Sequence, residues 1–228
     1  MYTLHIANKN YSSWSLRPWV LMREKRIEFR EVQTAFTESS NWENFRQFCP
    51  SGMVPCLQDG DLTVWDSLAI CEYLAESHSG VWPDEVEARA WARCAASEMH
   101  SGFFALRQDC SMNCALRVRL HHISDKLQRD ISRLDELLGE GLQRFGGSYL
   151  AGDSFTTVDA FYAPVAFRVQ SFGLELSNPV ADYMNRLLSL DSMLEWQKSA
   201  YAEPWREEGH EEEARKTGEV LKDYREER

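Results

Sequence analysis

The sequence predicts an α/β domain followed by an all-α domain. In the first part of the chain, short segments typical of strands alternate with segments typical of helices. In the rest of the chain, the apolar residues follow helical spacing. The change falls near Trp82 and Pro83, which we interpret as a linker. A chain of 228 residues with 43% apolar content can bury the core that two domains need. We expect domains over residues 1–80 and 81–202 and a charged C-terminal tail over residues 203–228.

Hydrophobic spacing in the first domain predicts strands and helices in alternation. The segment "YTLHIA" alternates with a period of two, which is typical of a strand, and "EFREVQ" predicts a weaker strand. Between them Leu16, Trp19 and Val20 follow helical spacing, so the helix starts near Ser12 to Ser15. The segments "NWENFRQF", "PCLQDGDLTVW" and "DSLAICEYLAESH" then predict a short helix, a hairpin and a third helix.

Two helical stripes dominate the second domain, and both are typical of core faces. They consist of Trp91, Ala95, Met99, Phe103 and Leu106, and of Leu120, Ile123, Leu127, Ile131, Leu134 and Leu138. Farther along, Thr156 and Asp159 have the spacing of a capping box at the start of a buried helix, which Pro164 should kink. From Glu203 onward charge is dense, which predicts a solvated helix or a loose tail.

Composition limits the classes of partner. The formal net charge of −11 argues against general affinity for nucleic acid or anionic membranes. No window approaches the roughly 20 apolar residues that span a bilayer, so we expect a cytoplasmic protein. The six cysteines have no CxxC pair, which fits a reducing compartment. Neither Cys110 with Cys114 nor His100, His121 and His122 complete a ligand set, so we expect no metal.

Three local features could carry chemistry: the serine pair at positions 12 and 13, "SGMVPCL", and "WDSLAICEYL". Each is ordinary by itself. Serine and aspartate are common helix N-caps, and only about 5–6% of X-Pro bonds in folded proteins are cis. A plain N-cap role for Ser13 or Ser15, and for Asp66 and Ser67, is therefore an alternative to a functional one.

In combination and on this strand order, the three features resemble the glutathione transferase superfamily, with a thioredoxin-like first domain. The resemblance runs from about Tyr2 to about Trp196. The segments "SSWSLRPWVLMREKRIEF", "FCPSGMVPCLQDGDLTVWDSLAICEYLAE" and "GDSFTTVDAFYAPV" are most similar to the zeta class, which includes maleylacetoacetate isomerases. The resemblance implies glutathione as co-substrate and a homodimer.

The resemblance also implies roles for individual residues. A helix N-terminus with hydroxyl donors lowers the pKa of a thiol. Ser12 would therefore activate the thiol of glutathione with help from Ser13, although other serine-using classes match better at Ser13. Val54, before a cis Pro55, would pair with the cysteinyl backbone of glutathione. At the start of the third helix, Ser67 would hold the γ-glutamyl carboxylate and Asp66 the ammonium group.

The electrophile should bind near "EMHSGFFALRQDC", where Phe104 would be a hydrophobic wall and Arg107 a cation for an acidic substrate. Core packing of Phe104 and a solvated Arg107 are the alternatives. The chain departs from the zeta pattern in three ways. Trp14 replaces a cysteine, and Ser171 aligns with a substrate arginine, with Arg168 one turn earlier. Pro18 stands where that class has a basic residue, which is compatible with a first helix that starts near Ser15.

Three functions are consistent with these residues. The first is addition of the glutathione thiolate to a small hydrophobic electrophile, without a metal. The second is glutathione-dependent cis-trans isomerisation of an acidic diene such as maleylacetoacetate, which requires a cationic side chain facing the substrate. The third is a non-catalytic binding module, because a fold does not by itself imply a function.

Overall fold

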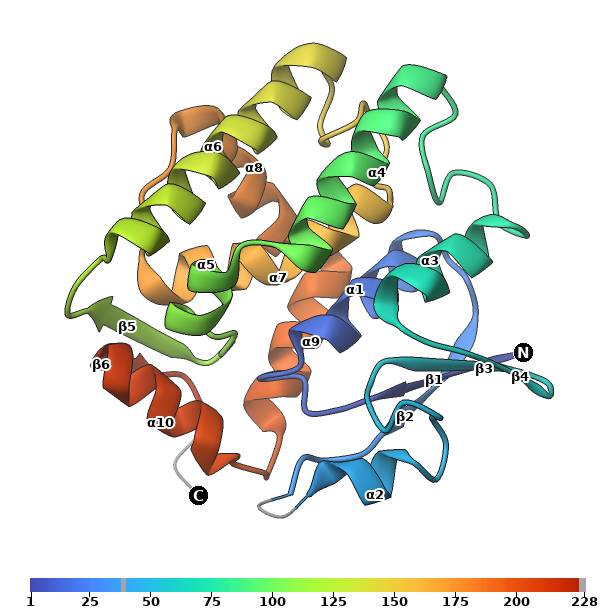
Figure 1. Cartoon of the computed structure of the whole chain (residues 1–228), viewed down its shortest axis with the longest axis horizontal. Helices are drawn as coiled ribbons and strands as arrows, with labels where there is room; N and C mark the ends of the chain where they lie inside the picture. Colours follow the sequence, from blue (N-terminus) through green and yellow to red (C-terminus); the bar gives the residue numbers. More distant parts are fainter. Residues whose placement is uncertain (38–39, 226–228) are drawn as a thin grey trace.

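A computed structural model describes residues 1–37 and 40–225 of the chain. The first part is a four-stranded mixed sheet in the order β2-β1-β3-β4, with α1 and α3 on one side and α2 on the other (Figure 1). Its elements are β1 (Tyr2–Ile6), α1 (Ser13–Glu24), β2 (Phe29–Gln33), α2 (Asn41–Phe45), β3 (Cys56–Asp59), β4 (Leu62–Val64) and α3 (Ser67–Ala75). Strand β1 pairs parallel with β2 and antiparallel with β3, and β3 pairs antiparallel with β4. The predicted order of strands and helices is confirmed.

Helix α1 begins at Ser13, two residues before the start that its proline was expected to need. Ser12 occupies the N-cap position, and its carbonyl accepts a bond from the backbone N–H of Leu16. Pro18 therefore lies inside the helix, past the first turn, where it cannot donate to the carbonyl of Trp14. Because α1 starts this early, both candidate serines lie at its N-terminus.

The second part is mainly helical, and one strand departs from the expected all-helical domain. Its elements up to residue 202 are α4 (Val86–Ser101), α5 (Phe104–Asp109), β5 (Leu116–Leu120), α6 (Asp125–Phe145), α7 (Thr157–Phe172), α8 (Asn178–Leu188) and α9 (Asp191–Ala202). Three residues that were expected in the helical stripes lie outside the helices. Phe103 has a left-handed backbone (φ 53°) that separates α4 from α5, Leu120 belongs to β5, and Ile123 precedes α6. None of the described helices is long and apolar enough to cross a membrane.

Of the two alternatives for the segment from residue 203, a solvated helix or a loose tail, the structure shows a mostly exposed helix that is not loose. Helix α10 (Glu208–Thr217) is followed by β6 (Gly218–Asp223), which pairs antiparallel with β5 (Figure 1). Glu211 and Arg225 are both buried and form an ion pair with 2.5 Å between Nη1 and Oε1. Most of the segment is exposed, and its buried charges Glu211 and Arg225 pair with each other; residues 226–228 lie outside the described part.

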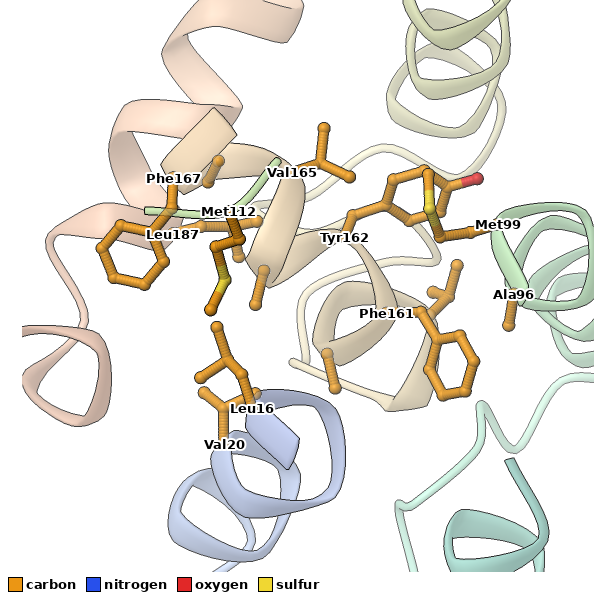
Figure 2. Close-up of a cluster of buried hydrophobic side chains, with 14 of the residues drawn as sticks. Leu16, Val20, Ala96, Met99, Met112, Phe161, Tyr162, Val165, Phe167 and Leu187 are labelled. Carbon is orange, nitrogen blue, oxygen red and sulfur yellow. The ribbon is translucent and has the colours of Figure 1, made fainter. Parts of the chain in front are cut away.

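Helix α7 runs through the core and packs against α1, α4 and α8. Figure 2 shows Leu16 and Val20 of α1 pointing toward α7, while Phe161 and Tyr162 of α7 point toward α4. Trp82 and Trp91 also belong to this core, whereas Val86 between them is exposed.

The predicted capping box at the start of α7 is confirmed. The buried carboxylate of Asp159 accepts bonds from the backbone N–H of Thr156 at 2.8 Å and of Leu150 at 3.0 Å. It also accepts the hydroxyl of Tyr183 at 2.9 Å, so one side chain links α7, α8 and the preceding loop. Burial raises the pKa of Asp159 to about 6, against the lowering effect of these hydrogen bonds.

We expect Asp159→Ala to lower the free energy of unfolding by about 3 kcal/mol or more, because it leaves several buried donors without an acceptor. Urea unfolding followed by circular dichroism measures this. The matched control is Asp153→Ala, which removes an exposed carboxylate from the same loop and should change stability by less than about 0.5 kcal/mol. Equal stability of the two variants would contradict the structural role of the capping box.

Candidate active site

A cavity of about 580 Å³ opens at the N-terminus of α1. Five of the predicted site residues line it: Ser12, Ser13, Val54, Phe104 and Arg107. The other walls come from the segment before α2, the end of α5, α7 and α10. Pro55, Asp66 and Ser67 are not among the lining residues, although the Val54–Pro55 bond is cis, as the resemblance implied.

The two serines differ in their hydrogen bonds. The hydroxyl of Ser12 donates to Ser15 Oγ at 2.7 Å, and Ser15 Oγ also accepts the backbone N–H of Ala7 at 3.3 Å. The hydroxyl of Ser13 instead accepts a bond from Arg168 Nη2 at 3.4 Å. Among the described residues, the Ser13 proton has no acceptor. Ser13 can therefore donate to an incoming group without breaking a bond.

Asp66 and Ser67 lie at the start of α3, as expected. Asp66 is the N-cap and accepts the backbone N–H of Leu68 at 2.9 Å, and its other oxygen lies 3.2 Å from His100 Nε2. The hydroxyl of Ser67 is buried and has no hydrogen-bond partner within the described residues. A buried hydroxyl without a partner is costly unless a ligand or water satisfies it.

Arginines gather at the inner end of the cavity. Arg107 and Arg168 line it, and Arg17 lies buried behind Trp14. Within residues 1–37 and 40–225, none of the three forms an ion pair with a carboxylate. Arg107 donates to the carbonyls of His100 and Gly102, and Arg168 to backbone carbonyls and Ser13.

The protonated forms of these arginines are destabilised by their surroundings. Burial first, and then the neighbouring Arg107 and Arg168, lower the pKa of Arg17 to about 9. Burial likewise lowers the pKa of Arg168 to about 10, and burial alone lowers that of Arg107. Glu213 lines the same cavity and partly offsets this effect at Arg168, but no carboxylate within the described residues forms an ion pair with the cluster, which favours an anionic occupant.

Trp14, which departs from the zeta pattern, organises this cluster. The guanidinium carbons of Arg17 and Arg107 lie 4.1 and 4.8 Å from the centre of its ring, within cation–π distance. His100 meets the same ring edge-on at 5.2 Å. The indole therefore fixes two cations rather than simply narrowing the cavity.

The C-terminal segment supplies a wall that the sequence analysis missed. His210 and Glu213 of α10 line the cavity. The segment is tied to the loop before α1, because the hydroxyl of Tyr11 donates to Glu211 and accepts from Arg225 Nη1 at 3.1 Å. The only signal for this wall in the sequence was that Glu207 and His210 are three residues apart, the spacing of a side-chain pair on a helix. Such a pair is easily interpreted as solvent-exposed.

The possible metal ligands do not converge. His100 pairs with Asp66, and His121 and His122 are exposed. Cys110 and Cys114 are buried thiols, and burial raises the pKa of both. In the part of the chain that the structure describes, no three His, Cys, Asp or Glu side chains gather in a way that could hold a metal ion.

This combination of a thioredoxin-like sheet, a helical second part and a serine-lined helix mouth defines the glutathione transferase class. Family models described as "Glutathione S-transferase, N-terminal domain" and "Glutathione S-transferase, C-terminal domain" match residues 11–77 and 117–208. The chain therefore belongs to the glutathione S-transferase superfamily.

Individual relatives agree with this assignment. Glutathione S-transferase F13 of Arabidopsis thaliana is 28% identical over 66% of this chain and 73% of its own length. Maleylacetoacetate isomerase of Rattus norvegicus is 27% identical over 79% of this chain and 86% of its own. A glutathione transferase homologue from Burkholderia gl BGR1, solved with bound glutathione, has the same fold, with a TM-score of 0.67 and 22% identity over 89% of this chain and 99% of that one.

The two fully buried arginines should respond oppositely to replacement by methionine. Arg17 has two buried nitrogens without partners, so Arg17→Met should leave the free energy of unfolding unchanged or raise it by up to about 2 kcal/mol. Arg168→Met leaves backbone carbonyls unpaired and should lower it by about 2 kcal/mol. Urea unfolding of both variants measures the difference, and a strongly destabilised Arg17→Met would show that Arg17 has a partner in solution.

Proposed function

We propose that this protein conjugates the thiolate of glutathione to small electrophiles. The observation that carries the proposal is the pair of serine hydroxyls at the start of α1, which line a cavity that also contains Phe104 and two arginines. A thiol placed there meets a helix N-terminus, hydroxyl donors and cations, each of which favours the thiolate. Phe104 is 70% exposed, so it is free to contact an apolar part of the electrophile rather than packing in the core.

Within the serine pair, the hydrogen bonds support Ser13 as the donor to the thiolate. The hydroxyl of Ser12 already donates its hydrogen bond to Ser15 Oγ. The hydroxyl of Ser13 accepts a hydrogen bond from Arg168, so its proton is available for a ligand. A hydroxyl that accepts from a cation is also a better donor, because the bond polarises its own O–H. Ser12 would then shape the helix mouth and assist.

The remaining contacts follow the family resemblance. Val54 lies at the cavity, where its backbone can pair with the cysteinyl part of glutathione next to Pro55. Asp66 and Ser67 at the start of α3 would hold the γ-glutamyl ammonium and carboxylate groups. The unpartnered hydroxyl of Ser67 supports this role, since a carboxylate would satisfy it.

A second function, isomerisation of an acidic diene by reversible addition of glutathione, is favoured by one observation. Arg107 and Arg168 line the cavity without carboxylate partners among the described residues, which is the arrangement that an acidic substrate needs. The aligned position 171 itself is a buried serine whose hydroxyl donates to the carbonyl of Asn113 at 2.7 Å. The cations would therefore come from other positions than in the zeta class.

The wider assignments are part of the same proposal. Residues 1–80 would form the glutathione-binding domain and residues 81–202 the helical domain, and two chains would form a homodimer, as the resemblance implies. The six free thiols fit a reducing compartment and support a cytoplasmic location.

We expect Ser13→Ala to raise the thiol pKa of bound glutathione by about one unit or more, and Ser12→Ala to raise it less. Thiolate absorbance against pH measures the pKa, and calorimetry with glutathione confirms that each variant still binds. The reverse order would assign activation to Ser12. Absence of glutathione binding to the wild-type protein at millimolar concentration would contradict the enzyme proposal and favour a non-catalytic module.

For the second function, Arg107→Gln should weaken binding of an acidic electrophile by about tenfold or more, because it removes a charge-assisted hydrogen bond. Steady-state kinetics with maleylacetoacetate or a close analogue measures this as a rise in KM. The matched control is Arg133→Gln, which replaces an arginine that already pairs with Glu98 away from the cavity. Equal effects of Arg107→Gln on acidic and neutral electrophiles would argue against anion recognition.

A further inference from the structure

His210 is held rigidly in the wall of the cavity. Its ring stacks on Tyr11 with 5.0 Å between ring centres and an angle of 26°, and on Phe36 at 5.7 Å and 21°. Its Nδ1 lies 2.5 Å from Glu207 Oε2, and its backbone N–H donates to the same carboxylate oxygen at 2.8 Å. The side chain is 33% exposed and lines the same cavity as the two serines.

Helix α10, which carries His210, is held in place relative to the N-terminus of α1. Tyr11 directly precedes Ser12, and it both stacks under His210 and joins the buried pair of Glu211 and Arg225. A second connection between the C-terminal segment and the loop before α1 lies nearby. There the carboxylate of Glu203 accepts hydrogen bonds from the backbone N–H groups of Lys9 and Asn10. The imidazole is therefore positioned by the same loop that positions the serines.

The Glu207 contact also orients the ring chemically. An ionised carboxylate only accepts hydrogen bonds, so Nδ1 donates its proton to Glu207 and Nε2 is the nitrogen left for other partners. Burial would raise the pKa of Glu207, but the hydrogen bonds from His210 hold it below its ordinary value. Within the described residues, Nε2 has no partner. An imidazolium carries a proton on each nitrogen, so in that form His210 can donate from Nε2 while Nδ1 stays bonded to Glu207.

On the basis of the function proposed above, we propose that His210 is the proton donor for electrophiles that accumulate negative charge when the thiolate adds. The substrate class would be α,β-unsaturated carbonyl compounds. The sulfur–carbon bond forms at the β-carbon, the π electrons of the double bond move toward the carbonyl oxygen, and an enolate results. Nε2 of the His210 imidazolium then transfers its proton to the enolate, and the neutral imidazole regains a proton from water.

This assignment separates two classes of electrophile. An aryl halide loses halide after thiolate attack and needs no proton, whereas an enone requires one before the product is complete. Positioned proton transfer contributes about 10²- to 10⁴-fold to rate. A residue that acts only by shaping the cavity would affect both classes alike.

The test compares benzylideneacetone, an enone, with chlorodinitrobenzene, an aryl halide, in the full-length protein. His210→Phe keeps a planar ring between Tyr11 and Phe36 but has no nitrogen, so the ratio of kcat/KM for the enone to that for the aryl halide should fall at least about tenfold. Glu207→Gln keeps an acceptor oxygen without the charge and should lower the ratio less. His122→Phe, at an exposed position that does not line the cavity, is the matched control and should leave the ratio unchanged.

Calorimetry with glutathione distinguishes failure of this assignment from failure of the proposed function. If His210→Phe binds glutathione normally and its ratio is unchanged, His210 is not the donor. An equal loss with both substrates also overturns the assignment and leaves His210 as a structural part of the wall. If the wild-type protein neither binds glutathione nor acts on either electrophile, the proposed function fails and this assignment fails with it.

Discussion

The packing of α1 on α7 is the contact on which the site depends. Leu16 and Val20 bury one face of α1 against α7, and this joins the sheet to the helical part (Figure 2). The same contact brings Arg168 of α7 to Ser13 at the mouth of α1. Because protein interiors are close-packed, a shift between the two helices would change the core and the serine environment together. Stability and the geometry around the serine pair are therefore linked through one interface.

Local charge in the site is opposite to the charge of the whole chain. The formal net charge is −11, yet Arg107 and Arg168 line the cavity and Arg17 lies behind Trp14, none of them in an ion pair within the described part of the chain. Buried cations that lack counter-charges cost stability in the free protein. An anion that enters recovers part of that cost, and low dielectric strengthens the attraction. Glutathione, with two carboxylates and a thiolate, has the chemistry that such an end of a cavity would bind.

The parts of the fold that follow from local patterns were predictable. The period-two alternation of "YTLHIA", the helical spacing after Ser12 and the Thr156–Asp159 capping box each depend on neighbours in sequence, and each is present. The C-terminal wall was not predictable in this way. Its contacts join residues about two hundred positions apart, such as Tyr11 with Arg225, and a charge-rich segment carries no sign of which partner will neutralise it.

The site shows the same division between local and distant information. The resemblance favoured Ser12 with Ser13 assisting, whereas the hydrogen bonds that favour Ser13 come from Ser15 within the helix and from Arg168 in α7. Phe104 could equally have packed in the core, and its exposure depends on the break between α4 and α5 at the left-handed Phe103, which spacing does not reveal. Side chains whose roles depend on tertiary neighbours cannot be ranked from spacing alone.

Trp14 connects two of the chain's departures from the zeta pattern. The indole occupies the position of a cysteine, and two guanidinium groups lie against it. The position aligned with the zeta-class substrate arginine is instead Ser171, which is buried and bonded to a backbone carbonyl. A large aromatic surface at the helix mouth can hold Arg107 beside the cavity, so a cation can be supplied from α5 rather than from position 171. The two substitutions are then parts of one rearrangement, in which positive charge is kept at the cavity while the residue that carries it changes.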